Sequence, residues 1–397
     1  MQLKVINAQI LAPSGPVLSG SLLADKGKIV SIAAGNDPGP AETVIDARGQ
    51  YLSPGFIDIH VHGGAGHDFM DNTVEAFLAI ARFHAGKGTT SMTPTTLSSG
   101  QALLLQTLDT YEQAHVQNHS GARFIGMHIE GPYFSMEQRG AQDPRHIRLP
   151  DPVEYEAIVK RYPFVRRWSI APELEGAMTL GRYLVQNNIL PSVAHTNAID
   201  EDVFEAFANG YTHATHFYNC MSTITRQGAY RYAGAIEAAY LLDPMTVEII
   251  ADGRHLPASL LKLVYKFKGP DKIALITDAM RGAGTQATSS ILGRNDDGLE
   301  VLIEDEVAKL PDRSAFAGSV ATADRLVRNM IDLAGVPLTD AIKMMTATPA
   351  RIMGVAGEKG SLVPGMDADL VLFDDHINVS HTIIGGKVIY SGDHFVA

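Results

Sequence analysis

The stretch Pro54-Gly-Phe-Ile-Asp-Ile-His-Val-His-Gly63 determines how the rest of the chain is interpreted. Its apolar residues predict a buried strand, and that strand ends in His60 and His62. Side chains two positions apart on a strand point to the same face, so the two imidazoles can converge on one metal ion. A His-x-His pair alone is more often a polar strand end than a metal site. A metal site is therefore predicted only if the later strands supply further ligands.

Composition narrows the class of protein. The chain has 397 residues, 45% of them hydrophobic, which is enough for a large core. A formal net charge of −12, without a block rich in Lys and Arg, argues against nucleic acid as a partner. No run approaches ~20 uninterrupted apolar residues, so no membrane span is expected. The single cysteine, Cys220, and an N-terminus unlike a signal peptide predict a cytoplasmic protein.

Strand-like runs alternate with helical patterns over residues 53–354. Eight such runs begin at Phe56, Thr89, Phe124, Trp168, Pro191, Tyr211, Thr246 and Lys272. Helices are expected at 73–86, 99–118, 152–162, 176–188, 200–209, 235–241 and 257–268, with two more at 319–335 and 338–353. Eight β-then-α units predict an α/β fold, the (β/α)8 or TIM barrel. The alternative is an open doubly wound sheet, which the absence of a G-x-G-x-x-G pattern after the first strand weakens.

Both ends of the chain carry short strand patterns separated by turns rich in Gly and Pro. These patterns fill residues 1–52 and 355–397. We therefore expect the two ends to combine into a small β-sandwich domain, beside a barrel domain of residues 53–354.

Polar residues follow the predicted barrel strands at their carboxyl ends, where barrel enzymes place their active sites. They include His60, His62, Glu130, His195, His216, Asn219, His255 and Asp278. Any single one can be an ordinary polar strand end, whereas many on one rim indicate a site.

Imidazoles together with carboxylates suit a divalent ion, for which we expect zinc, with iron, manganese or cobalt as alternatives. Such an ion lowers the pKa of its bound water to about 7, so hydroxide becomes available as a nucleophile. Asp278 is placed to take the proton and return it to the leaving group, and His255 to polarise the carbonyl. The predicted reaction is hydrolysis of an amide, an ester or a similar bond.

Several stretches occur in the order found in one enzyme family. They are Gly126-Met-His-Ile-Glu-Gly-Pro-Tyr, Ile170-Ala-Pro-Glu, Ala194-His-Thr-Asn, Thr215-His-Phe-Tyr-Asn-Cys-Met-Ser, Ile250-Ala-Asp-Gly-Arg-His, Ile276-Thr-Asp-Ala-Met and Ala317-Gly-Ser. With the opening stretch and Gly365-Met-Asp-Ala-Asp-Leu-Val-Leu, the sequence resembles the metal-dependent amidohydrolase superfamily. Within it the chain is most similar to the N-acetylglucosamine-6-phosphate deacetylases. This resemblance implies release of acetate and glucosamine 6-phosphate from a phosphorylated amino sugar.

The resemblance also implies roles for residues. Glu130, His195 and His216 match the principal metal ligands, and His60 and His62 match ligands of a second ion that Glu130 would bridge. One or two ions are therefore expected. Asp278 matches the catalytic acid and base at the metal, and His255 matches a histidine at the substrate. Further substrate contacts are implied for Asn219, Cys220 and Ser319.

Two stretches depart from the family pattern. Where the family commonly has Lys-Gly-Ala-His, this chain has Arg139-Gly-Ala-Gln142, so Gln142 replaces a substrate-side histidine. The family's phosphate-binding arginine aligns cleanly with neither Arg226 nor Arg231. The substrate could therefore be another N-acyl amino sugar, such as N-acetylgalactosamine 6-phosphate. A further alternative is that the protein binds metal without being a catalyst. A homodimer is also implied by the resemblance.

Overall fold

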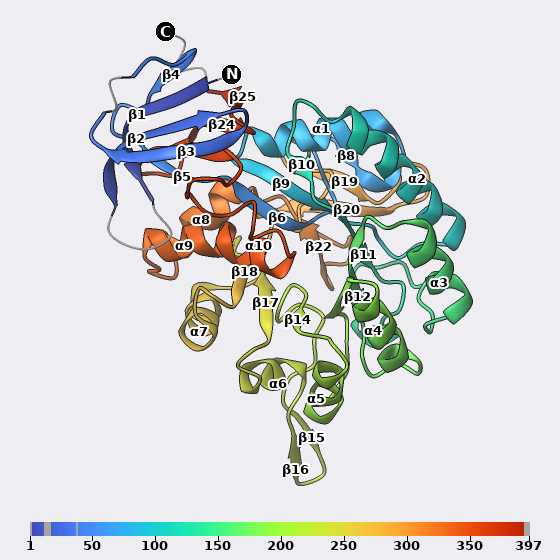
Figure 1. Cartoon of the computed structure of the whole chain (residues 1–397). Coiled ribbons are helices and arrows are strands. Elements are labelled where there is room, and N and C mark those ends of the chain that lie inside the picture. Colours follow the sequence, from blue (N-terminus) through green and yellow to red (C-terminus); the bar gives the residue numbers. More distant parts are fainter. Residues whose placement is uncertain (1, 12–16, 37–38, 393–397) are drawn as a thin grey trace.

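The computed structural model describes residues 2–11, 17–36 and 39–392. Figure 1 shows a β-sheet that carries strands from both ends of the chain, next to a larger part built of strands and helices. None of the described helices is long and apolar enough to cross a membrane.

One eight-stranded sheet joins the two ends of the chain. Its strands are β1 (Gln2–Ile10), β2 (Leu18–Asp25), β3 (Lys28–Ala34), β4 (Thr43–Asp46), β5 (Tyr51–Pro54), β23 (Leu370–Phe373), β24 (Val379–Ile384) and β25 (Lys387–Ser391). β5 links the two sets, because it runs parallel to β1 and antiparallel to β23. This sheet has a hydrophobic core of its own, in which Val5, Leu52 and Leu372 are fully buried. The arrangement as a two-layered sandwich and the domain limits stay predictions.

The eight expected runs between residues 56 and 278 all contain parallel strands. One sheet holds β6 (Phe56–Val61), β9 (Thr89–Pro94) and β10 (Arg123–Phe124), and the other holds β11 (Met127–Glu130), β12 (Val165–Ile170), β13 (Leu190–Val193), β14 (His213–Ala214), β17 (Thr246–Ile249) and β18 (Ile273–Leu275). A parallel bridge between Thr95 and His128 joins them on one side. On the other side the Asp278 N–H donates to the His60 carbonyl at 2.9 Å. The α/β class is confirmed.

The third expected strand differs from its prediction. It is divided into β10 and β11, since Gly126 between them has a φ of 132°, which lies outside the strand region.

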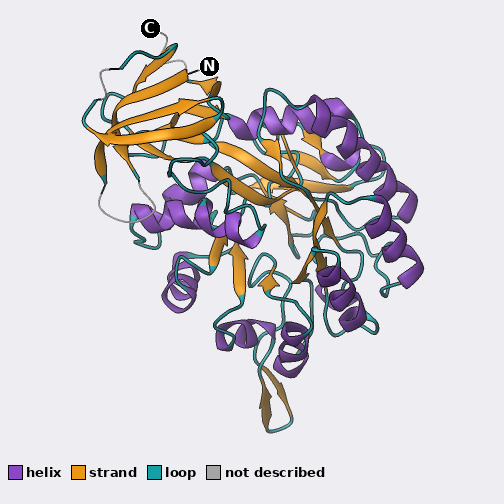
Figure 2. Ribbon diagram, viewed as in Figure 1, coloured by secondary structure: helices purple, strands orange, loops and turns teal. Residues whose placement is uncertain are grey.

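Helices follow the strands in turn and lie outside them in Figure 2. They are α1 (Val74–Ala85), α2 (Gln101–Gln117), α3 (Pro152–Arg161), α4 (Ala177–Gln186), α5 (Asp200–Ala208), α6 (Ala235–Leu241) and α7 (Ala258–Lys268). Two of them begin at side-chain caps: the Ala76 N–H donates to Thr73, and the Val153 N–H donates to Asp151. Each expected helical range holds one of these helices.

After β18, the two expected helices have different limits from those predicted. A four-stranded antiparallel sheet forms there from β19 (Ser289–Leu292), β20 (Leu299–Glu304), β21 (Val307–Lys309) and β22 (Phe316–Ser319). Because β22 pairs with β21, the helix expected at 319–335 begins later, as α8 (Ala323–Asp332). The helix expected at 338–353 is divided into α9 (Leu338–Met345) and α10 (Ala347–Ile352) at Thr346, whose ψ of −82° is not helical.

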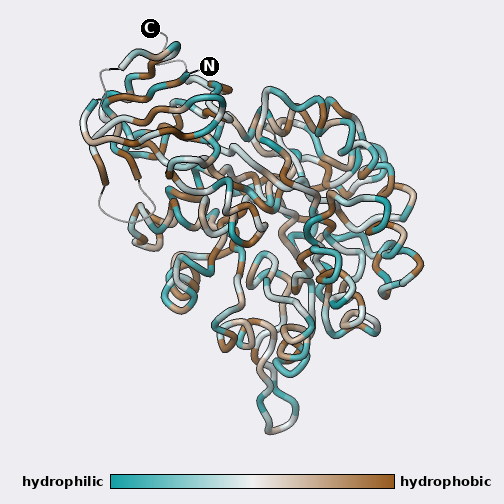
Figure 3. The backbone as a smooth tube through the Cα atoms, viewed as in Figure 1, coloured by the Kyte–Doolittle hydropathy of each residue, from teal (hydrophilic) through white to brown (hydrophobic). Residues whose placement is uncertain are grey.

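A short hairpin, β15 (Thr225–Gln227) and β16 (Tyr230–Tyr232), was not expected. All six of its strand residues are exposed. Figure 1 shows it projecting from the body of the molecule, and Figure 3 shows that its chain is largely hydrophilic. A strand that buries neither face has no apolar alternation, so the sequence gives little sign of it.

Candidate active site

Three predicted site residues lie just beyond their strands in a left-handed backbone conformation. The angle φ is 44° at His195, 24° at His216 and 47° at Asp278. Residues other than glycine rarely adopt a positive φ, and such strained positions gather at functional sites.

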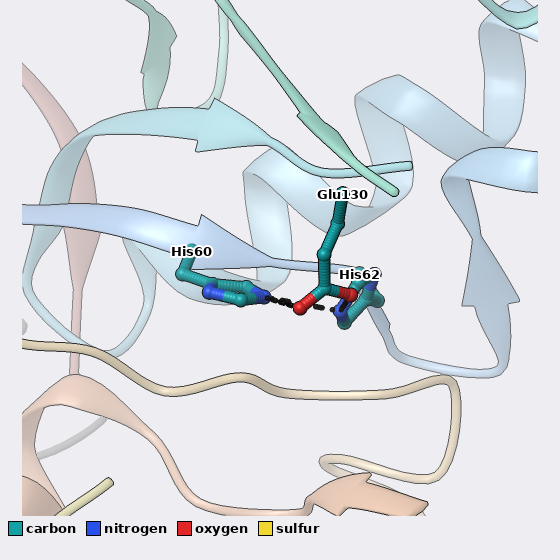
Figure 4. A group of neighbouring side chains, drawn as sticks. All are labelled: His60, His62 and Glu130. Carbon is teal, nitrogen blue, oxygen red and sulfur yellow. Dashed lines mark hydrogen bonds and ion pairs between the residues drawn. The ribbon is translucent and has the colours of Figure 1, made fainter. Parts of the chain in front are cut away.

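His60, His62 and Glu130 form a first group of buried side chains, shown in Figure 4. The two Nε2 atoms are 3.2 Å apart. The Glu130 carboxylate places Oε1 3.3 Å from Nε2 of His60 and Oε2 3.4 Å from Nε2 of His62. Alternation along β6 brings both rings to the carboxylate that ends β11, as the opening stretch predicts.

Glu130, His195 and His216 form a second group, which shares its carboxylate with the first. Oε1 of Glu130 lies 3.2 Å from Nε2 of His216 and 3.6 Å from Nε2 of His195. The two imidazole Nε2 atoms are 3.1 Å apart.

These distances fit a metal ion. Ligands that surround an ion tetrahedrally at ~2.0–2.1 Å are themselves about 3.3 Å apart. Pairs of imidazole Nε2 atoms at 3.1 and 3.2 Å need either a proton or a cation between them. The described residues therefore include two groups that could hold a metal ion, and imidazole with carboxylate is a donor set for borderline divalent ions.

The charge around the first group, and around the carboxylate that both groups share, also favours a cation. Burial alone would lower the pKa of His60, but the negative charges of Glu130, Glu248 and Asp278 raise it to about 9. Burial opposes ionisation of Glu130, yet the positive charge of His60 and the contacts with His195 and His216 hold its pKa well below the usual value. A site that attracts a proton this strongly attracts a metal cation for the same reason, and the two compete.

Hydrogen bonds on the far side of two rings fix their orientation. Nδ1 of His60 lies 2.7 Å from Oε1 of Glu248, and Nδ1 of His195 lies 2.8 Å from the carbonyl of Gln138. Both partners accept hydrogen bonds, so each Nδ1 carries a proton and each Nε2 is the ring nitrogen that can bind an ion in place of a proton.

Asp278 lies against the first group. Its Oδ1 is 3.2 Å from Nε2 of His62 and 3.5 Å from Nε2 of His60. Burial opposes its ionisation, but the charges of His60 and His62 lower its pKa. Asp58, on the same face of β6, instead accepts from the Thr277 hydroxyl at 2.5 Å, and burial raises its pKa to about 7. Asp58 thus ties β6 to the segment that carries Asp278.

A cavity of about 270 Å³ opens over both groups. Its lining consists of His62, Leu97, Glu130, Ala141, Gln142, His195, His216, Tyr218, Asn219, Cys220, His255, Asp278, Leu292, Ala315, Phe316 and Gly318. Most of the predicted site residues therefore face one space. Residues of the β19–β22 sheet region, including Phe316 and Gly318, form one wall of the cavity.

The polar residues of the cavity wall are held by their own partners. Nδ1 of His255 lies 2.7 Å from Oδ2 of Asp252, so Nε2 is the ring nitrogen left for other contacts. Gln142 donates its amide to Oε2 of Glu130 at 2.6 Å, while its oxygen accepts from the Ser98 N–H at 2.8 Å. The residue that departs from the family pattern thus contacts the carboxylate shared by both groups.

Three predicted substrate contacts lie elsewhere. Ser319 is buried and donates its hydroxyl to the Thr277 carbonyl, while its neighbour Gly318 lines the cavity. Arg226 and Arg231 occupy opposite positions on the two strands of the exposed hairpin. Neither lines the cavity of its own chain. Their role as phosphate contacts stays a prediction.

Arg167 and Glu248, in the interior beneath the site, were not among the residues predicted to matter for it. Arg167 and Glu248 form an ion pair with neither side chain exposed. Burial and the charge of Arg167 keep the pKa of His128 well below its usual value, so this ring is neutral. A charged residue inside an otherwise apolar strand, as in Thr246-Val-Glu-Ile-Ile, was the available signal, because such a residue needs a buried partner.

The sequence is similar to those of known proteins. The sequence profile of the amidohydrolase family matches residues 51–389. The chain is 32% identical over 356 residues to the N-acetylglucosamine-6-phosphate deacetylase of Lysinibacillus sphaericus, covering 87% of each chain. It is also 32% identical over 358 residues to the N-acetylgalactosamine-6-phosphate deacetylase of Escherichia coli O157:H7, covering 90% of this chain and 92% of that one.

A solved structure agrees. The N-acetylglucosamine-6-phosphate deacetylase of Pasteurella multocida superimposes with a TM-score of 0.91 at 27% identity, covering 99% of this chain and 100% of that one. The profile match spans most of the chain, and the deacetylases match it over nearly their whole length. The chain therefore belongs to the amidohydrolase family, on the branch that contains the N-acetylglucosamine-6-phosphate deacetylases.

Proposed function

We propose that the protein hydrolyses N-acetylglucosamine 6-phosphate to glucosamine 6-phosphate and acetate. The observation that carries this proposal is the pair of His/Glu groups that share Glu130 beside Asp278 in one cavity. Deacetylases of N-acetyl amino-sugar phosphates match nearly the whole chain, which supports this substrate class. A catalytically silent relative would have no need to keep Asp278 against His62 in a strained backbone conformation.

The proposal includes a closed (β/α)8 barrel of residues 53–354. Closure is supported by the Thr95–His128 bridge, which joins the end of β9 to β11, and by the hydrogen bond from Asp278 to His60, which joins the segment after β18 to β6. Such a barrel would place His60, Glu130 and His195 on one rim.

In the proposed reaction the two groups hold one or two divalent ions, with zinc expected. A bound ion supplies Lewis acidity, which makes water more acidic and a carbonyl more electrophilic. Asp278 accepts a proton from the attacking water and passes it to the amine as the C–N bond breaks. His255, whose Nδ1 is held by Asp252, contacts the acetyl oxygen through Nε2. Asn219 and the turn at Cys220 contact the phosphate.

Replacing His60 and His62 together is expected to remove one metal equivalent. Glu130, His195 and His216 keep a complete ligand group in that variant, so the second ion stays. The measurement is the zinc content per subunit by elemental analysis after dialysis against a fixed free zinc concentration. Loss of all zinc would instead make His60 and His62 the principal metal anchor.

The second candidate substrate is N-acetylgalactosamine 6-phosphate, the 4-epimer of N-acetylglucosamine 6-phosphate. The relatives named as deacetylases of these two sugars are equally similar to this chain, at 32% identity. Acetate release is to be measured for both N-acetyl amino-sugar 6-phosphates and for both sugars without phosphate. A higher kcat/KM for the glucosamine derivative supports the proposal. A preference for the galactosamine derivative would reassign the substrate while leaving the reaction intact.

We also propose a homodimer in which the β15–β16 hairpin reaches the partner subunit. An isolated two-stranded hairpin is at best marginally stable in water, and this one exposes Tyr230 and two arginines.

A cytoplasmic location is likewise proposed, because one cysteine fits a reducing compartment.

Changing Arg226 and Arg231 together to alanine is expected to raise KM for the phosphorylated sugar by about 10- to 100-fold, the usual worth of a charged hydrogen bond. KM for the sugar without phosphate should stay unchanged. The matched control is Arg182→Ala, an exposed arginine on α4. Equal losses on both sugars, or a monomeric mass by light scattering for the unaltered protein, would contradict the proposed role of the hairpin.

A further inference from the structure

A buried ion pair lies beneath both candidate metal groups. Nη1 of Arg167 on β12 is 2.5 Å from Oε2 of Glu248 on β17, and both side chains are fully buried. Burying two charges carries a large desolvation penalty, and a protein with apolar residues in their place is often equally stable or more stable. Stability alone therefore gives no reason for this pair.

One oxygen of Glu248 contacts a ligand candidate from each group. Oε1 accepts a hydrogen bond from Nδ1 of His60 at 2.7 Å and another from the backbone N–H of His216 at 3.1 Å. In addition, the Phe217 N–H donates to the backbone carbonyl of Glu248 at 2.7 Å. The strained turn that carries His216 is thus attached to Glu248 at two successive residues.

Arg167 fixes Glu248 in this position. Its guanidinium donates to the Ile59 carbonyl, to the Ser192 hydroxyl and to the Thr215 hydroxyl at distances of 3.3, 3.1 and 2.8 Å. Arginine stays charged in proteins, so the carboxylate beside it stays an acceptor. Nδ1 of His60 must then be the donor, which leaves Nε2 free to bind an ion.

The four rings differ in how they are held. Within the described part of the chain, Nδ1 of His62 and Nδ1 of His216 have no hydrogen-bond partner. His216 is therefore oriented through its backbone, by Glu248. His195 is held separately, by the Gln138 carbonyl.

We propose that Glu248, fixed by Arg167, is a positioning residue that prepares His60 and His216 to bind metal ions in the two groups. This inference rests on the proposed metal dependence of the site. The carboxylate would set the tautomer of His60 and hold the turn of His216, without touching the substrate or an ion.

The test is Glu248→Gln in the full-length protein. A glutamine cannot present an oxygen to Arg167 and to His60 at once, so one hydrogen-bond donor is left facing another. Zinc affinity, measured by competition with a chromogenic chelator on metal-free protein, is expected to fall about 10- to 100-fold. The visible absorption spectrum of the cobalt-loaded protein, which reports ligand geometry, should also change.

The control is Glu154→Gln, which alters another nearly buried carboxylate that is paired with an arginine, Arg148, away from both metal groups. It should leave zinc affinity and the cobalt spectrum unchanged. Absence of bound metal in the unaltered protein would contradict the proposed function itself. Metal binding by the unaltered protein together with the same affinity and spectrum in Glu248→Gln would overturn only the positioning role.

Folding of the variant is checked on the metal-free protein by its thermal unfolding. If Glu248→Gln does not fold, Glu248→Asp keeps the charge for Arg167 and withdraws the carboxylate by one methylene. Weaker zinc binding by a folded Glu248→Asp protein supports the proposal. Failure of both variants to fold would assign Glu248 to the fold and overturn it.

Discussion

Asp278→Asn is expected to lower kcat by about 10²- to 10⁴-fold, the usual contribution of general acid–base catalysis. The amide keeps the size of the side chain but cannot accept a proton from water or return it to the amine. KM should change little, because substrate contacts are assigned to other residues. The measurement is acetate release under substrate saturation, with zinc content determined on the same samples.

The zinc content decides how this result is interpreted. Asp278 lies 3.2 Å from Nε2 of His62, so a variant that also lost metal would not isolate proton transfer. The matched control is Asp109→Asn on α2, which removes an exposed carboxylate bonded to Arg161. Unchanged kcat in a metal-loaded Asp278→Asn protein would exclude Asp278 as the acid and base.

Glu130→Gln is expected to have the second large effect, a decrease in zinc affinity of more than about 100-fold for both ions. Supporting residues around a metal typically contribute 10- to 100-fold, and a shared ligand should exceed that. The carboxylate belongs to both groups, whereas His60 and His62 belong to one. The measurement is the zinc content per subunit of Glu130→Gln and of the His60 and His62 double variant. A ligand shared by both ions should lower the content more than ligands of one ion do.

The protein with Glu154→Gln serves again as the control, since it loses a carboxylate of similar burial outside the site. Retention of one zinc ion by Glu130→Gln would mean that Glu130 does not bridge, so the site would have to be described as two separate groups.

Much of the fold follows from local patterns along the chain. The strand from Phe56 to Val61 lies where its apolar residues predict it, and α6 spans Ala235–Leu241 as expected. The metal groups could also be anticipated, because the ends of parallel strands meet at one edge and bring together residues as distant as His60 and His216.

Other features depend on contacts that no local pattern records. Glu248 is separated by 81 positions from Arg167 and by 188 from His60, so the sequence shows a charge in a strand without its partners. The start of α8 shifted because residues up to Ser319 pair with β21, which overrides their helical pattern. The hairpin with Arg226 and Arg231 buries neither face, so it has no periodic signal.

Acetate release from N-acetylglucosamine 6-phosphate is the most informative assay for metal-dependent removal of the acetyl group. The protein is assayed after zinc loading, after removal of zinc by a chelator, and after reloading. We expect turnover at about 1–10³ s⁻¹ with zinc, its loss on chelation and its return on reloading. If zinc-loaded protein released acetate from this sugar and from its 4-epimer no faster than Asp278→Asn does, the protein would not be a metal-dependent deacetylase of these sugars.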